Sequence, residues 1–132
     1  MHVHIEQLEG RRMAIRARGL ELIIDDTTKA GGPGDGFRPT ELLLGALGSC
    51  MIGTMVTFAR NQGIEVEDIS MTVEDEALEH PDRIGTIRVA MKLSTDADDR
   101  RLKTLERVAG ACKIHNTLES APHIEFDFLP MR

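Results

Sequence analysis

The longest uncharged stretch of this sequence limits its fold more than any other feature, because so much apolar surface has to be covered. The eighteen residues from Leu42 to Ala59 carry no charge, and as a helix they would be about 27 Å long at roughly 1.5 Å per residue. That length is at the lower edge of a transmembrane span. Small residues at Gly45, Ser49 and Gly53 would let a second helix approach closely.

We favour a core helix over a membrane span and expect no membrane partner. The strands predicted elsewhere in the chain are amphipathic and would have little to pack on without this helix. A helix that is apolar on every side needs more cover than one sheet gives, so the sequence predicts a homodimer that buries it. The glycine and serine face would then form a close helix–helix contact, inside the fold or across the dimer.

Most of the remaining sequence alternates apolar and polar residues as β-strands do, with turn residues between the runs. Strands are predicted within residues 1–30, and a hairpin within residues 65–93 that turns at Glu79–Asp82. A closing strand is predicted at residues 123–129, where three large apolar residues alternate with acidic ones: Ile124, Phe126 and Phe128.

Two helical regions separate these strands. The long helix covers residues 39–62, beginning near Pro39 and ending before Gly63, since proline is favoured at the first helical position and glycine after the last. The second region covers residues 96–119, with Asp96 as its N-cap and a short further helix at its end. This order predicts a single α+β domain over residues 1–132, with mostly antiparallel sheets packed on helices.

Composition narrows the function classes. The net charge of −6, with four Phe and no Trp or Tyr, argues against a nucleic-acid partner, which would require basic patches or aromatic stacking platforms. No basic segment followed by an apolar one precedes the first strand, so we expect a cytoplasmic protein. The loop at residues 31–36 has four glycines but no phosphate-binding lysine, and we interpret it as a connector.

Two cysteines are the candidates for chemistry. Cys50 lies inside the apolar run, and Cys112 ends the second helical pattern. A thiol buried among apolar side chains is usually inert and protonated, and each cysteine alone is well explained as a small core residue. With one cysteine on each strong helix, however, the thiols become a redox pair if the fold brings them together.

The sequence around both cysteines resembles the OsmC/Ohr family of osmotically inducible and organic-hydroperoxide-resistance proteins. The first motif runs from Pro39 through Cys50 to Gly63, and the second from Cys112 to Leu118. The predicted order of strands and helices also resembles that of the family. The resemblance implies an OsmC-like fold, an intertwined homodimer with two long central helices. Each of its two sites would hold a cysteine pair and draw on both subunits.

The resemblance also implies thiol-dependent reduction of organic or lipid hydroperoxides to alcohols, in defence against oxidative stress. Cys50 would be the peroxidatic thiolate, which attacks the distal peroxide oxygen and becomes a sulfenic acid. Cys112 would be the resolving cysteine, which condenses with it to a disulfide. An external dithiol, of the lipoyl type in the Ohr branch, would reopen the disulfide, and no bound cofactor is expected.

In the peroxidase branches of the family an arginine near the N-terminal strands activates the thiolate, and a glutamate orients it. We assign the arginine role to Arg12. The glutamate of the Ohr branch directly follows the proline, whereas here Thr40 holds that position and Glu41 comes next. One residue on a helix is a rotation of about 100°, enough to aim Glu41 elsewhere. The arginines considered were Arg11, Arg12, Arg16 and Arg18.

The second motif has His115 where many relatives have serine. If a helix begins near Cys112, His115 lies on the same face one turn later. The imidazole would then raise the thiolate fraction or donate a proton to the alkoxide leaving group. The substrate pocket would be walled by apolar side chains of the long helix: Leu44, Leu47, Met51, Met55 and Phe58.

Two other functions stay open at this point. One is a non-catalytic module that binds a hydrophobic small molecule in an apolar cavity at the dimer seam. The other is a zinc site made of Cys50, Cys112, His115 and His123, although no pair of these has zinc-finger spacing. We regard zinc as the weaker alternative and predict no metal site.

Overall fold

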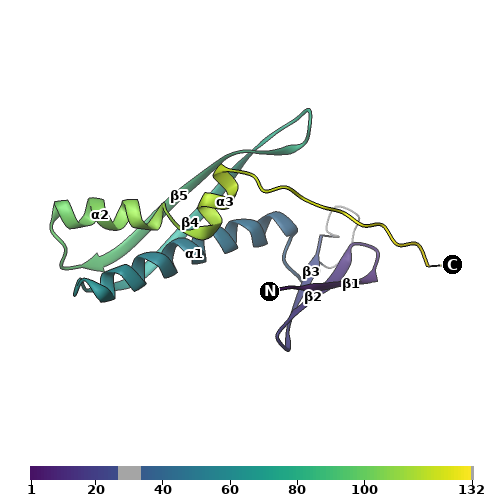
Figure 1. The fold of residues 1–132 in the computed structure, drawn as a ribbon, viewed down its shortest axis with the longest axis horizontal. Coiled ribbons are helices and arrows are strands. Elements are labelled where there is room, and N and C mark those ends of the chain that lie inside the picture. Colours follow the sequence, from purple (N-terminus) through teal and green to yellow (C-terminus); the bar gives the residue numbers. More distant parts are fainter. Residues whose placement is uncertain (27–33, 132) are drawn as a thin grey trace. The chain divides into compact units, whose positions relative to one another are not determined.

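The structure, a computed structural model, describes residues 1–26 and 34–131. In this part of the chain the element order is three strands, a long helix, two strands and two helices (Figure 1). The α+β class predicted from the sequence is therefore confirmed. The elements are β1 (His4–Glu9), β2 (Arg12–Ala17), β3 (Leu20–Asp25), α1 (Pro39–Asn61), β4 (Val66–Leu78), β5 (Arg83–Thr95), α2 (Asp99–Ala109) and α3 (Lys113–Glu119).

The chain forms two compact units, residues Met1–Ala46 and Leu47–Arg132. The first unit contains an antiparallel sheet in the order β1-β2-β3. Its tight turns place Gly10 and Gly19 at positive φ, at 55° and 80°, a conformation that glycine adopts at little cost. In the register of this sheet, Ile5, Ile15 and Leu22 form one row across the three strands.

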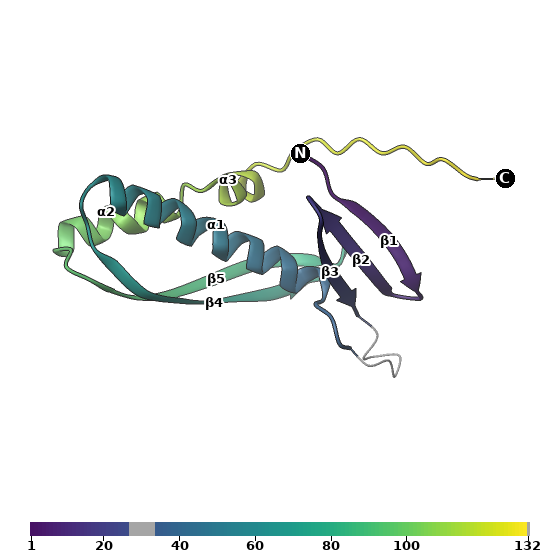
Figure 2. The ribbon, with the colours of Figure 1, turned by 90° about the horizontal axis from the view of Figure 1, so that it is seen from below.

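The second unit contains the β4–β5 hairpin and the helices that cover one of its faces (Figure 2). Its core joins the second half of α1 to α2, and apolar residues of the hairpin pack against it. Alternate strand residues face this core because successive side chains of a strand point to opposite faces. The buried core residues are Met55, Ala59, Ile64, Leu105 and Ala109.

Gly48 is the small residue of α1 that makes a close contact within the chain. A Cβ atom at this position would lie 2.9 Å from Met71 Sδ and 3.2 Å from Val73 Cγ2, so α1 packs directly on β4 here. Among the described residues nothing lies within 4 Å of a Cβ built on Gly45 or Gly53. At Gly45 and Gly53 the predicted small-residue face therefore makes no close contact with the described part of the chain.

Helix α1 is long and apolar enough to cross a membrane by length and composition, the one such helix in the described residues. Only 22% of its apolar window is buried inside this chain. The described part of one copy therefore covers little of its most apolar element, and the homodimer expected from the apolar pattern of this helix stays a prediction.

Two local predictions are wrong. Residues 123–129 form no strand, because they pair with no other strand in the described chain. The N-cap of α2 is Asp98, whose side chain accepts from the backbone N–H of Arg101 at 2.9 Å. Asp96 instead accepts from the backbone N–H of Glu65 at 3.1 Å, so this carboxylate ties the start of the hairpin to its end.

Replacing Asp98 with alanine removes the acceptor for a free N–H at the start of α2. We expect the free energy of unfolding to fall by about 1 kcal/mol, whereas Asp98→Asn, which keeps an acceptor oxygen, should retain most of it. Urea unfolding at one fixed protein concentration measures this, since the stability of an oligomer depends on concentration. Equal losses in the two variants would contradict the assignment.

Candidate functional site

Cys112 is the N-cap residue of α3. Its backbone is extended (φ −74°, ψ 158°), and its Sγ accepts a hydrogen bond from the backbone N–H of His115 at 3.3 Å. The residue is 1% exposed. This capping geometry holds the thiol beside the first turn of α3, where backbone N–H groups have no acceptor inside the helix.

Cys50, in the middle of α1, supplies an acceptor for these N–H groups. The backbone N–H groups of Ile114 and Lys113 donate to its sulfur, and so does the hydroxyl of Thr54, one turn further along α1. The thiol of Cys112 is a further donor. Both cysteines are free thiols. The fold therefore brings together the two thiols that the sequence singled out.

These contacts move the pKa values of the two thiols in opposite directions. The pKa of Cys50 is lowered, chiefly by the N–H of Ile114, with burial acting against it. The pKa of Cys112 is raised, chiefly by burial; the N–H of His115 opposes this rise and the nearby Cys50 adds to it. Hydrogen bonds to the charged form favour a thiolate, and desolvation disfavours it. Cys50 is therefore the thiol of the pair that loses its proton more readily.

His115 lies in the first turn of α3, as predicted, and contacts Cys112 through its backbone. Its Nε2 lies 3.4 Å from Oε1 of Glu119, one turn later. Its Nδ1 is buried and has no hydrogen-bond partner among the described residues. The backbone of His115 thus positions the thiol of Cys112, while its imidazole has one buried nitrogen that can take part in a further hydrogen bond.

The predicted pocket residues do not share one cavity. Met51 and Met55 line an apolar cavity of about 390 Å³ between α1, β5 and α2. Phe58 packs against the core, and Leu47 is buried at 3% exposure, whereas Leu44 is half-buried. The other lining residues of the cavity are Val89, Met91, Leu93, Leu102, Lys103, Leu105, Glu106 and Ala109.

Arg12, in the other unit, is held by two carboxylates. Its Nη1 lies 3.3 Å from Oδ2 of Asp25, a side chain with no exposed surface, and it also pairs with Asp35. The pKa of Arg12 is raised, chiefly by its hydrogen bond to Asp35. The same Asp25 oxygen accepts from the backbone N–H of Asp35 at 3.4 Å. Arg12 therefore fastens the segment before α1 to the end of β3.

Backbone hydrogen bonds fasten the same segment. The N–H of Asp25 donates to the carbonyl of Phe37 at 3.0 Å, and the N–H of Phe37 to the carbonyl of Ile23 at 3.2 Å. A Cβ at Gly36 would lie 2.6 Å from the carbonyl oxygen of Ile23. Only glycine fits where two backbones approach this closely.

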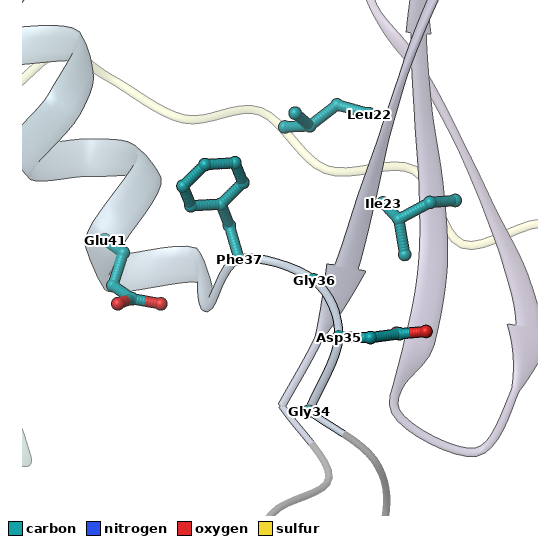
Figure 3. Close-up of a pocket in the computed structure, with 7 residues that line it drawn as sticks. All are labelled: Leu22, Ile23, Gly34, Asp35, Gly36, Phe37 and Glu41. Carbon is teal, nitrogen blue, oxygen red and sulfur yellow. The ribbon is translucent and has the colours of Figure 1, made fainter.

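Glu41 acts at the start of α1. Its Oε1 accepts from the backbone N–H of Arg38 at 2.8 Å, the reciprocal half of a capping box. Figure 3 shows Glu41 at one side of a cavity of about 460 Å³, with Phe37 between it and Leu22. The carboxylate is thus engaged by the helix start, and Arg12 has other acidic partners.

Sequence reasoning missed three parts of these sites. Thr54 was not singled out, although it stands four residues after Cys50, the spacing of neighbours on a helix face. The sequence indicates only that Asp25 belongs to a strand and Asp35 to a loop. Their role as the acidic partners of Arg12 becomes visible only in the structure. The backbone donors to Cys50 carry no sequence signal at all, because any residue other than proline supplies an N–H group.

The described residues contain no group of three or more His, Cys, Asp or Glu side chains that could hold a metal ion. The zinc set considered from the sequence is therefore not assembled in this part of the chain.

Residues 32–127 match the family model described as OsmC-like protein. This chain belongs to the OsmC-like family. A relative, the uncharacterized protein YmaD of Bacillus subtilis, is 27% identical over 104 residues, which cover 73% of this chain and 69% of YmaD. Its name assigns no activity.

Solved structures support the same fold. An OsmC-like protein from Mycoplasma pneumoniae superposes with a TM-score of 0.80 at 19% identity, over 91% of this chain and 87% of that one. An organic hydroperoxide resistance protein OsmC from Legionella pneumophila superposes with a TM-score of 0.65 at 22% identity, over 91% of this chain and 90% of that one. At these identities the likeness establishes the fold.

The two thiols of this OsmC-like protein should react at different pH. We expect alkylation of Cys50 by iodoacetamide to reach its half-maximal rate at lower pH than alkylation of Cys112, because only Cys50 has a lowered pKa. Mass spectrometry of peptides from the reduced protein resolves the two rates. Thr54→Val removes one donor and should shift the Cys50 profile to higher pH, while Thr57→Val, at an exposed position of α1, should not. The reverse order of the two cysteines would contradict the assignment.

Arg12→Ala removes the cation that pairs with the buried carboxylate of Asp25. We expect a lower urea midpoint, because the buried Asp25 carboxylate loses the cation that compensates its charge. Arg11→Ala is the matched control, since Arg11 pairs with Asp26 through side chains that are 65% and 26% exposed, where ion pairs contribute little. A loss no larger than that of the control would contradict this role.

Proposed function

We propose that this OsmC-like protein reduces organic hydroperoxides to alcohols, with Cys50 as the peroxidatic residue and Cys112 as the resolving residue. The observation that carries the proposal is the environment of Cys50. Its sulfur receives hydrogen bonds from two backbone N–H groups, a hydroxyl and a second thiol, and these donors favour the reactive thiolate. A cysteine that only fills space in a core would not require four hydrogen-bond donors around its sulfur.

In the first step the Cys50 thiolate attacks the distal oxygen of the hydroperoxide. The O–O bond breaks, the sulfur takes that oxygen and becomes a sulfenic acid, and the alkoxide leaves. The alkoxide needs a proton to become an alcohol. The imidazole of His115 is the candidate donor, since Glu119 lies beside one nitrogen and the other is buried without a partner among the described residues.

In the second step the thiol of Cys112 condenses with the sulfenic acid. The new S–S bond releases the hydroxyl of the sulfenic acid, which leaves as water with the proton of Cys112. The raised pKa of Cys112 favours the protonated thiol, which supplies this proton when the disulfide forms. An external dithiol, with the lipoyl type as a candidate, then reduces the disulfide and is itself oxidised.

The proposal extends to substrate and setting. The uncharged run of α1 that carries Cys50 favours alkyl or lipid hydroperoxides over hydrogen peroxide. Arg12 is the weakest part of the sequence assignment, because Asp25 and Asp35 already hold it, and the backbone donors of α3 supply what an activating cation would. We further propose a cytoplasmic homodimer in which a second copy covers α1.

A second candidate function rests on the apolar cavity of about 390 Å³ lined by Met51 and Met55. Its volume falls in the range of small-molecule sites, so a hydrophobic ligand held without turnover is the competing proposal. Neither cysteine lines this cavity. The two functions therefore predict different results with peroxide. A peroxidase loses both free thiols, and a ligand-binding module keeps them.

One equivalent of cumene hydroperoxide should remove both free thiols from the reduced protein and lower its mass by about 2 Da, the two hydrogens lost on forming a disulfide. Intact-mass spectrometry with a thiol count measures both changes. Cys50→Ser should abolish the reaction, and Cys112→Ser should stop it at a sulfenic acid that dimedone traps. Unchanged thiols over many minutes would refute the peroxidase and favour the ligand-binding module.

A further inference from the structure

The apolar cavity of about 390 Å³ has a buried floor and partly exposed walls. It lies between α1, β5 and α2, on the side where the helices cover one face of the hairpin (Figure 2). Met55 and Leu105, each 2% exposed, form the floor. Met51 and Met91 are half-buried in the walls, and Val89 is 36% exposed there. Apolar side chains left open around a cavity of this size are typical of a small-molecule site.

The cavity is long enough for an extended alkyl chain. On α2 its lining runs from Leu102 to Ala109, about 10 Å of helix at roughly 1.5 Å per residue. On β5 it runs from Val89 to Leu93, about 13 Å at roughly 3.3 Å per residue. Three methionines lie along it, and these flexible side chains adapt to the shape of an apolar ligand. The apolar lining therefore fits an unbranched chain of medium length.

Two residues of opposite charge complete the lining, Lys103 and Glu106 of α2. Both are exposed, and neither side chain forms an ion pair or hydrogen bond within the part of the chain that the structure describes. Residues three apart are neighbours on a helix surface. A cationic head group would be repelled by Lys103, and an anionic one by Glu106. A hydroxyl group suits both, because its oxygen accepts from an ammonium while its O–H donates to a carboxylate.

We propose that this cavity binds an aliphatic alcohol of medium chain length. The chain lies against the methionines, and the hydroxyl lies between Lys103 and Glu106. The inference rests on the cavity of the second candidate function and gives its ligand a chemical class. It does not depend on the peroxide chemistry, since neither cysteine lines the cavity.

The site is tested first by NMR on the reduced protein, labelled with carbon-13 at the methionine methyl groups and titrated with 1-octanol. We expect saturable shifts of the signals of Met51, Met55 and Met91, which line the cavity. The signals of Met13 in β2 and Met71 in β4 should stay in place. No saturable shift, or equal shifts at all five methionines, would overturn the site.

A variant that fills the cavity checks the same location. Val89→Trp places a large ring in the lining and should abolish the octanol-induced shifts. Ala90→Trp is the matched control, because the next residue of β5 points to the opposite face and is exposed, so octanol should still bind. Octanol binding that persists in Val89→Trp, with circular dichroism equal to that of the control, would also overturn the site.

The head group is tested by titration calorimetry with 1-octanol, octanoate and octylamine. We expect octanol to bind at least about threefold more tightly than either ion, the size of one exposed charge interaction. Glu106→Gln should strengthen octanoate and Lys103→Gln should strengthen octylamine, each by a similar factor. Arg101→Gln, which removes an exposed charge outside the lining, should do neither.

Equal affinities for the three compounds, or the same changes in the control, would refute the role of the charged pair. The peroxidase is judged separately by the thiol count with cumene hydroperoxide. Loss of both thiols without octanol binding would support the peroxidase and refute this inference, whereas octanol binding with unchanged thiols would support the inference and refute the peroxidase.

Discussion

The backbone N–H groups at the start of α3 are the constraint on which the thiol site depends. A helix begins with N–H groups that no residue of the helix can accept. Here the acceptors are two sulfur atoms. Cys112 caps the helix by accepting from His115, and Cys50 of α1 accepts from Ile114 and Lys113. The same contacts join α1 to α3 and place the thiols side by side. They also separate the two pKa values, since hydrogen-bond donors lower the pKa of Cys50 and burial raises the pKa of Cys112.

A different interaction organises the unit before the helix. Asp25 is fully buried, so its charge must be compensated, and Arg12 does this together with hydrogen bonds from the backbone. The segment that leads into α1 is fastened to β3 by this ion pair and by the close approach of Gly36. Glu41 completes the arrangement by capping the start of α1. Arg12 and Glu41 thus have structural partners of their own, and the properties of Cys50 already follow from donors within its own unit.

One copy of the chain leaves much apolar surface exposed in two further regions. Helix α1 is covered over only a small part of its apolar length, and the segment with Phe126 is almost fully open to solvent. Burial of apolar area is the main favourable term in folding and in association. These surfaces are therefore where the proposed second copy would bury the most apolar area.

The sequence alone determined the α+β class, the long helix from Pro39, the hairpin and the two cysteines as the candidate chemical groups. These features follow from short stretches of sequence: the spacing of apolar residues, proline and glycine at the ends of helices, and the chemical reactivity of cysteine. It misjudged residues 123–129, because alternation shows that a segment can be a strand but not where its partner lies. It placed the α2 cap at Asp96 instead of Asp98, since several aspartates nearby suit an N-cap equally well. Only the tertiary structure showed that Cys50 and Cys112 meet, that the pKa of Cys50 is the lowered one of the two, and that Arg12 is held by Asp25 and Asp35. Contacts between residues far apart in the chain, and backbone donors that any residue can supply, leave no pattern in the sequence.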